Sequence, residues 1–162
     1  MEGNIIVALR QNHALEHATV SLLIKRVGPN VRMVGISTHD GFYIFGDVPT
    51  DAVREAATEG LERLKKGDSE LAVSPFCGTN LVVAGTMAGL ASLMVMGSKD
   101  RRKKVLPVIV AATLAIIAAR PVGRAAQKYV TTSSDVADVS IRRITRRGVG
   151  NRILHKVETA RE

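Results

Sequence analysis

The stretch Asn12-His13-Ala14-Leu15-Glu16-His17 lies within residues 4–26, which the sequence predicts to form one long helix. In a helix, His13 and His17 lie one turn apart on one face, and Glu16 borders the same surface. Two imidazoles one turn apart can bind one Zn²⁺ ion, and a neighbouring carboxylate can accept a proton from a water on the metal. The H-x-x-E-H pattern therefore predicts His13 and His17 as zinc ligands and Glu16 as the catalytic acid–base residue. The alternative is an amphipathic helix whose histidines make only ordinary hydrogen bonds.

The helix face that carries the two histidines is otherwise apolar, so we expect both imidazoles to point towards the interior of the protein. The rest of residues 1–75 is expected to form the first part of a small α+β head. Because His39 falls in a predicted turn, we expect it to be exposed rather than bound to a metal. The expected elements that follow the first helix are a strand hairpin over residues 31–45, a helix from residues 47–51 to about 66, and a strand near residues 71–74.

The longest apolar run lies in the middle of the chain. No charged residue occurs from Phe76 to Ser98, and a helix needs roughly 20 apolar residues to cross a bilayer. After the basic loop Lys99–Lys104, a second uncharged segment runs over Val105–Ala119. We predict a transmembrane helical hairpin over residues 76–119. A hairpin buried inside a soluble domain is the alternative, since the second segment also has the length of an ordinary core helix.

Small residues in both segments favour close packing of two helices in lipid, where no hydrophobic drive brings helices together. The first segment contains the G-x-x-x-G pair Gly85 and Gly89, and the second contains several alanines. The glycine pair could join the two helices of the hairpin. It could equally join two copies of the chain in a homo-oligomer, or join the chain to a larger membrane complex.

Residues 120–162 are expected to return to the head and complete it. A short interfacial helix is predicted over Val122–Lys128, followed by strands over residues 136–144 and 153–159. The basic, glycine-containing segment Arg146–Asn151 is expected to form the turn between these two strands. In the last strand, His155 falls on the same alternating face as its apolar neighbours. His155 is therefore either a buried structural residue or a further metal ligand.

The composition narrows the classes of partner. The net charge is +8, but aromatic residues make up only 3% of the chain, so basic regions lack rings for stacking on bases. We therefore expect a lipid bilayer rather than nucleic acid as the partner. The single cysteine, Cys77, excludes an internal disulfide and suits a reactive or metal-bound thiol. Met1–Arg10 lacks the pattern of a signal peptide, so we expect a multi-pass protein of the cell membrane with its head in the cytoplasm.

Four short motifs occur along the chain: His13-Ala14-Leu15-Glu16-His17-Ala18-Thr19, Gly46-Asp47-Val48-Pro49-Thr50, Cys77-Gly78-Thr79-Asn80-Leu81 and Tyr129-Val130-Thr131-Thr132. In this order they resemble the motifs of an uncharacterised family of small bacterial membrane proteins, defined only as a domain of unknown function. The resemblance covers nearly the whole chain. It implies an integral-membrane location with two spans, and it implies no activity, substrate or ligand set.

The histidine motif also resembles that of the inverted zinc peptidases. The resemblance implies that His13 and His17 are ligands, that Glu16 is the base, and that a glutamate further along the chain completes the site. Cys77 offers another completion, because peptide deformylases hold their metal with two histidines and one cysteine and use the motif glutamate as acid–base. The available glutamates, none favoured by its spacing, are Glu55, Glu59, Glu62 and Glu70.

Three functions follow from these patterns. The first is a membrane-anchored zinc-dependent hydrolase, peptidase-like or amidase-like, that acts near the membrane surface through His13, His17, Cys77 and Glu16. The second is a non-catalytic protein with a structural zinc site, in which His155 or His39 supplies the fourth ligand. The third is a metal-free membrane subunit or scaffold that docks through its hairpin.

Overall fold

The computed structural model describes residues 4–97, 105–149 and 152–162, and the chain divides into two compact units. The first unit, which we call the head, comprises Met1–Ser74 and Lys128–Glu162. The second unit, which we call the hairpin, comprises Pro75–Gln127.

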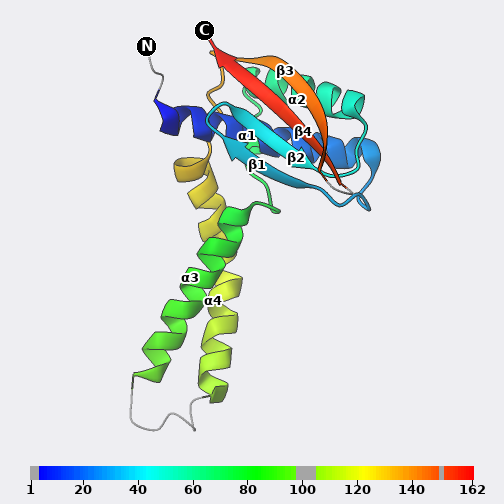
Figure 1. The fold of residues 1–162 in the computed structure, drawn as a ribbon. Coiled ribbons are helices and arrows are strands. Elements are labelled where there is room, and N and C mark those ends of the chain that lie inside the picture. The colour runs from blue at the N-terminus through cyan, green and yellow to red at the C-terminus, as the bar shows by residue number, and fades with distance from the viewer. Residues whose placement is uncertain (1–3, 98–104, 150–151) are drawn as a thin grey trace. The chain divides into compact units, whose positions relative to one another are not determined.

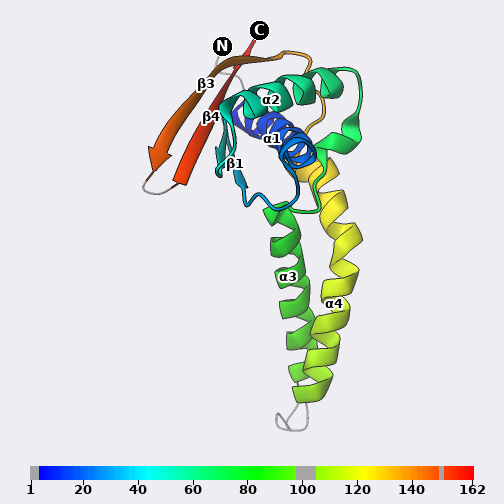
Figure 2. The same cartoon turned by 90° about the vertical axis from the view of Figure 1, so that its right-hand side faces the viewer.

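The head is an antiparallel four-stranded sheet in the order β1-β2-β4-β3, with α1 and α2 covering one of its faces (Figures 1 and 2). This confirms the expected α+β head. Its elements, in chain order, are α1 (Ile5–Val27), β1 (Val34–Thr38), β2 (Gly41–Phe45), α2 (Thr50–Lys65), the 3₁₀ helix η1 (Ser69–Ala72), β3 (Val139–Val149) and β4 (Arg152–Arg161).

Both ends of α1 carry the local signals that fix a helix. The side chain of Asn4 accepts a hydrogen bond from the backbone N–H of Ile6 at 3.0 Å, which satisfies one of the free amide donors of the first turn. At the other end, Gly28 adopts a φ of +93°, a conformation that glycine reaches without steric cost, and Pro29 follows it. The predicted extent of the first helix is therefore confirmed.

The core lies between the two helices and the inner face of the sheet. Leu15 and Leu23 of α1 and Phe42 of β2 are fully buried there, and burying one such side chain contributes about 1.5–3 kcal/mol. Gly60 of α2 lies so close to α1 that a Cβ on it would be 3.1 Å from the Cβ of Ala18. The two helices therefore pack closely, which fixes the position of the α1 face that carries the histidines.

Three predictions about the elements are wrong. Residues 69–72 form η1 rather than a strand near 71–74, because Gly67 turns the chain with a φ of +92° and Ala72 is buried as part of a helical turn. The basic segment from Arg146 continues β3 as far as Val149 instead of forming a turn, since these residues pair with β4. The rest of that predicted turn, residues 150–151, lies outside the described residues. The predicted separate helix Val122–Lys128 is part of the continuous helix Val105–Thr131.

The hairpin consists of two helices, α3 (Gly78–Met96) and α4 (Val105–Ala126), and α4 continues directly into η3 (Gln127–Thr131), a π-helical turn. By length and composition, α3 and the continuous helix Val105–Thr131 could each cross a membrane. Near one end, Gln127 Nε2 donates a hydrogen bond to Asn80 Oδ1 at 2.8 Å, and Gly123 lies against Asn80. This contact aligns the start of α3 with the end of α4.

The glycine pair of α3 does not pack against α4. Among the residues that the structure describes, a Cβ on Gly85 or on Gly89 would meet no atom within 4 Å. The less exposed side of α4 instead carries small residues at helical spacing, namely Ala111, Ala112, Ala115 and Ala119. The alanines of the second segment therefore serve close packing as expected, whereas Gly85 and Gly89 leave an open small-residue face.

Candidate metal site in the head

His13 and His17 lie side by side on the inward face of α1. Their ring centroids are 4.3 Å apart, and the ring planes are inclined by 60°. His17 is buried and His13 is half-buried. The helical spacing of the motif therefore brings the two imidazoles together on an interior surface, as the sequence predicts.

Each imidazole is anchored through Nδ1 to a backbone carbonyl of a distant segment. His13 Nδ1 donates to the carbonyl oxygen of Thr131 at 2.9 Å, and His17 Nδ1 donates to that of Ala72 at 2.8 Å. Because a carbonyl oxygen only accepts, Nδ1 carries the proton, and in the neutral ring Nε2 then carries the lone pair. Metal-binding histidines usually donate their other N–H to such a partner, which fixes the tautomer and the ring orientation.

His17 Nε2 is a buried nitrogen that has no hydrogen-bond partner among the described residues. The carboxylate oxygen Oε2 of Glu16 lies 3.8 Å from it, which is too long for a hydrogen bond. Leaving a buried acceptor unpaired costs about 1–3 kcal/mol. A metal ion on Nε2 would remove that cost, so this nitrogen could serve as a metal ligand.

The carboxylate of Glu16 lies between α1 and β1, against the backbone of Gly35. A Cβ on residue 35 would overlap the carboxylate and the Cγ of Glu16. Only glycine leaves room here for a carboxylate beside the His17 ring. Glu16 is itself buried, so the site holds an acidic group next to the free lone pair of an imidazole.

The residues just before His13 fix α1 to the rest of the head. The guanidinium of Arg10 donates to the carbonyls of Tyr129 and Thr132, at 3.1 and 3.0 Å. The Gln11 amide donates to the carboxylate of Asp138 at 2.8 Å. The segment that supplies the carbonyl for His13 is thus tied to α1 by neighbouring side chains, which makes the imidazole position part of a rigid hydrogen-bonded frame.

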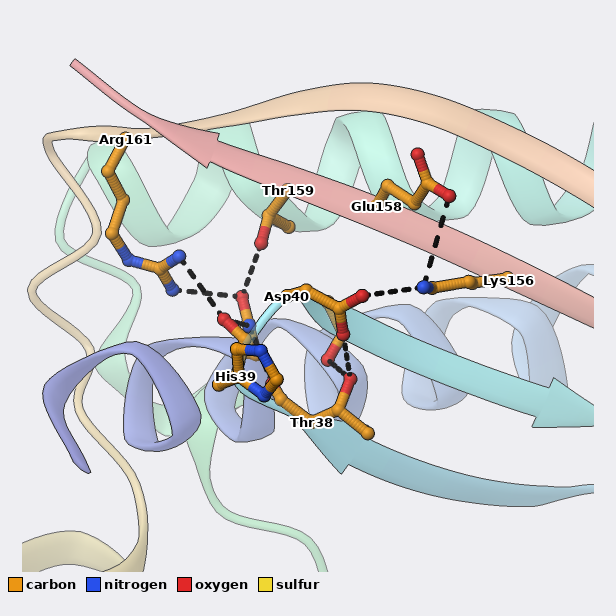
Figure 3. Close-up of polar contacts among 9 residues, drawn as sticks. Thr38, His39, Asp40, Lys156, Glu158, Thr159 and Arg161 are labelled. Carbon is orange, nitrogen blue, oxygen red and sulfur yellow. Dashed lines mark hydrogen bonds and ion pairs between the residues drawn. The ribbon is translucent and has the colours of Figure 1, made fainter. Parts of the chain in front are cut away.

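Asn12 likewise fixes α1 to the sheet. Its Nδ2 donates to the carbonyls of Thr38 and His39 in the β1–β2 turn, at 2.7 and 3.1 Å. Its Oδ1 accepts from Thr159 Oγ1 at 2.9 Å and from the Arg161 guanidinium at 3.2 Å. Figure 3 shows Thr159 and Arg161 of β4 on one side of this network and the turn residues on the other. Asn12 therefore joins helix, turn and β4 at one point.

The same turn carries an ion pair that links β4 to the β1–β2 loop (Figure 3). The Lys156 ammonium donates to Asp40, and Thr38 Oγ1 donates to the same residue at 2.7 Å. The hydrogen bond from Lys156 and then that from Thr38 lower the pKa of Asp40 below its ordinary value, and Asp40 raises the pKa of Lys156. The charges of this network stabilise the β1–β2 turn and are not part of the histidine site.

His39 and His155 occupy different surroundings from the histidine pair. His39 is exposed in the turn, as expected. His155 is fully buried on β4, and its Nε2 lies 3.1 Å from Thr50 Oγ1 at the start of α2. Burial, and then the charge of Arg146, lower the pKa of His155. Among the described residues, neither histidine belongs to a group of metal-ligating side chains, so their roles as ligands stay predictions.

Cys77 belongs to the other unit, where it precedes α3. Its Sγ accepts a hydrogen bond from the backbone N–H of Thr79 at 3.4 Å and so caps the helix. A thiolate accepts such a bond better than a thiol does.

Two of the glutamates suggested by the resemblance to zinc peptidases lie on the surface. Glu55 and Glu59 both form ion pairs with Arg26 on the surface of the head, which makes them unsuited to a buried site.

Gly35, Ala72 and Thr131 are the site residues that sequence reasoning misses. The last two act through backbone carbonyls, which any residue type supplies, so no sequence signal identifies them. Gly35 could have been suspected, because glycine inside a strand often marks the close approach of another group.

Comparisons with known proteins identify a family and a relative, and they assign no activity. A family model described as a domain of unknown function, DUF6391, matches residues 8–144. An uncharacterized protein of Picosynechococcus sp. is 37% identical over 142 residues, which cover 79% of this chain and 67% of the relative. No solved structure matches the chain.

Proposed function

We propose that this chain, which belongs to the DUF6391 family of unknown function, is a membrane-anchored zinc-dependent hydrolase that cleaves a peptide or amide bond near the membrane surface. The observation that carries the proposal is the buried lone pair of His17 Nε2, which lacks a hydrogen-bond partner among the described residues while Nδ1 is fixed by the Ala72 carbonyl. A buried imidazole in this state is prepared to bind a metal ion.

His13 and His17 supply the first two ligands. Their Nδ1 atoms are both held by carbonyls, and their rings are adjacent. Nitrogen donors of this kind suit Zn²⁺, which binds imidazole at about 2.0–2.1 Å. Glu16, whose carboxylate oxygen is 3.8 Å from His17 Nε2, is close enough to act on a water molecule at the metal without itself being required as a ligand.

Cys77 is proposed as the third ligand on the basis of chain connectivity and chemistry. The Ala72 carbonyl accepts a hydrogen bond from His17, and Cys77 follows Ala72 by five residues. The Cα atoms of Ala72 and Cys77 can therefore be at most about 18 Å apart. Imidazole nitrogen and thiolate sulfur are both donors that Zn²⁺ binds, and three protein ligands leave the fourth position of a catalytic zinc site open.

A small number of residues would carry out the proposed reaction. Zn²⁺ held by these ligands would lower the pKa of a coordinated water molecule and would polarise a substrate carbonyl. Glu16 accepts the proton of the attacking water and later donates it to the leaving amine. Gly35 keeps the Glu16 carboxylate beside His17, and the carbonyls of Ala72 and Thr131 hold the imidazoles in the orientation that the metal needs.

The hairpin is the reason for proposing that the protein is bound to a membrane. Two helices that could cross a membrane follow the site residues of the head and would restrict the protein to the bilayer surface. Substrates that are themselves attached to a membrane then meet the site at high local concentration. We therefore propose a multi-pass membrane protein whose head faces the cytoplasm.

The decisive experiment compares Glu16→Gln with the wild-type protein, both purified in detergent, on a panel of N-acyl amides and short peptides. We expect Glu16→Gln to retain zinc and to lose turnover by a factor of about 10²–10⁴, because it removes acid–base catalysis and leaves the ligands intact. Glu62→Gln, on an exposed position of α2, is the matched control and should retain both zinc and turnover.

Two results would overturn the catalytic part of the proposal. Full turnover in Glu16→Gln would remove the assigned acid–base residue. Zinc-loaded wild-type protein that cleaves no bond of the panel would instead support the non-catalytic alternative, a membrane subunit with a structural metal.

A further inference from the structure

A group of exposed apolar side chains surrounds the point where α1 meets the end of the helix that leaves the hairpin. The group, which we call the docking surface, lies entirely within the head, and its members are between 41% and 70% exposed. It consists of Ile5, Ile6 and Leu9 of α1 and Tyr129 and Val130 of η3.

Helical spacing places the α1 members on the side that meets η3. Ile6 lies one turn before Arg10, whose guanidinium bonds to the Tyr129 carbonyl, and Leu9 lies one turn before His13, whose Nδ1 bonds to the Thr131 carbonyl. The face of α1 that contacts residues 129–132 therefore continues into the apolar side chains of its first two turns.

The chain path places the η3 members at the edge of the proposed membrane segment. The helix Val105–Thr131 is continuous, and Gln127 is level with Asn80 of α3 through their 2.8 Å hydrogen bond. Since the uncharged run of α3 already begins at Phe76, the apolar band of the hairpin extends to this level. Tyr129 follows Gln127 by two residues, only about 3 Å along a helix.

The sequence segments that carry this surface contain more basic than acidic residues. No Asp or Glu occurs from residue 105 to 134, whereas Arg120, Arg124 and Lys128 do occur there, and Arg10 is the one lysine or arginine between residues 4 and 15. The Lys128 ammonium lies 5.8 Å from the centre of the Tyr129 ring. Tyrosine and basic residues at the end of an apolar helix are typical of the headgroup region of a bilayer.

We propose that the docking surface inserts its apolar side chains into the headgroup layer of an anionic bilayer and so holds the head against the membrane. The inference rests on the membrane hairpin of the proposed function. Because Leu9 lies one turn before His13, such docking would bring the histidine face of α1 next to the lipid surface. The substrate class of the proposed enzyme would then be amides or peptides carried by lipids or by membrane-embedded chains.

The absence of tryptophan from the sequence allows a direct test with single-tryptophan variants of the full chain, reconstituted in phosphatidylcholine–phosphatidylglycerol vesicles. Ile6→Trp reports on the docking surface. Ile36→Trp, at a 50% exposed position of β1, reports on the sheet face turned away from α1. Leu114→Trp, at a 61% exposed position of α4, reports on insertion of the hairpin. Quenching by brominated lipids is measured for each.

We expect strong quenching of Leu114→Trp and quenching of Ile6→Trp at least about threefold stronger than that of Ile36→Trp, as for a side chain in the interface. Without phosphatidylglycerol, the quenching of Ile6→Trp should fall while that of Leu114→Trp stays unchanged. If Leu114→Trp is quenched but Ile6→Trp behaves like Ile36→Trp, or is blue-shifted without quenching, the docking inference is overturned and the hairpin stands. If Leu114→Trp is not quenched, the membrane hairpin itself is overturned.

Discussion

The carboxylate of Glu16 occupies the space that a Cβ on Gly35 would need. Glu16 comes from the motif on α1 and Gly35 from the middle of β1, so the sheet takes part in positioning the acidic group of the site. The missing side chain at Gly35 therefore leaves the space that the Glu16 carboxylate occupies.

Gly35→Ala should displace the Glu16 carboxylate without removing a metal ligand. We expect zinc to be retained, turnover to fall by at least about tenfold, and stability to fall by about 1–3 kcal/mol, as for other overpacked sites. Gly148→Ala is the matched control in β3, because a Cβ there meets no atom of the described part of the chain within 4 Å. The double variant Gly35→Ala, Glu16→Gln should be no slower than Glu16→Gln alone; additive losses would argue against a shared role.

Asn12→Ala should destabilise the head by about 2–4 kcal/mol, because it leaves two turn carbonyls and the partners on β4 without the amide. Asn12 is fully buried and bonds to Thr38, His39 and Thr159. Urea unfolding followed by circular dichroism measures the loss. Thr58→Ala, at an exposed position of α2, should change stability by less than about 0.5 kcal/mol. Equal stability of the two variants would contradict the role assigned to Asn12.

The stability of the head should fall as the pH falls below 6.5, the ordinary pKa of histidine, because of His155. Burial and Arg146 lower its pKa in the folded state, so below pH 6.5 the unfolded chain binds the proton more readily than the folded chain. The contribution of His155 to the free energy of unfolding is fully present above pH 6.5. It decreases as the pH falls from 6.5 to the lowered pKa of His155, by up to about 1.4 kcal/mol per pH unit.

His155→Gln isolates this contribution, since glutamine can still bond to Thr50 and does not titrate in this range. Urea unfolding of both proteins at several pH values on either side of 6.5 gives the comparison. We expect a smaller slope for His155→Gln. The same slope in both proteins would show that another group causes the pH dependence.

Gly123→Leu should separate the two helices of the hairpin, because Gly123 lies against Asn80 and leaves no space for a side chain. We expect a clear drop in the melting temperature of the protein in detergent and the loss of the bond between Asn80 and Gln127. Gly85→Leu is the matched control, because a Cβ there meets open space. If Gly85→Leu is as damaging as Gly123→Leu, Gly85 must pack against a partner, such as a second copy of the chain.

The sequence predicts most of the fold because the local signals agree with the tertiary environment. Asn4 and Gly28 mark the ends of α1, the two-residue turn marks the strand hairpin, and uncharged runs mark α3 and α4. The prediction fails at residues 69–74, where a short apolar segment fits a strand or a helical turn equally well and packing decides. It also fails in β3, whose arginines suggest a turn but pair with β4 at the edge of the sheet.

The candidate site is predictable only in part. Helical spacing gives the adjacency of His13 and His17 and the nearby carboxylate. The carbonyls of Ala72 and Thr131 leave no trace in the sequence, because every residue carries a carbonyl and only the fold selects one.

Metal content tests the central claim most directly. Wild-type protein purified in detergent without added chelator should contain about one zinc per chain by elemental analysis, and His17→Ala should contain almost none. His39→Ala, which removes an exposed histidine of the same head, should keep the full amount. In the cobalt-substituted protein, Cys77→Ser should remove the sulfur-to-cobalt charge-transfer band. Wild-type protein without zinc after incubation with excess zinc, or equal zinc in His17→Ala and wild type, would contradict the account.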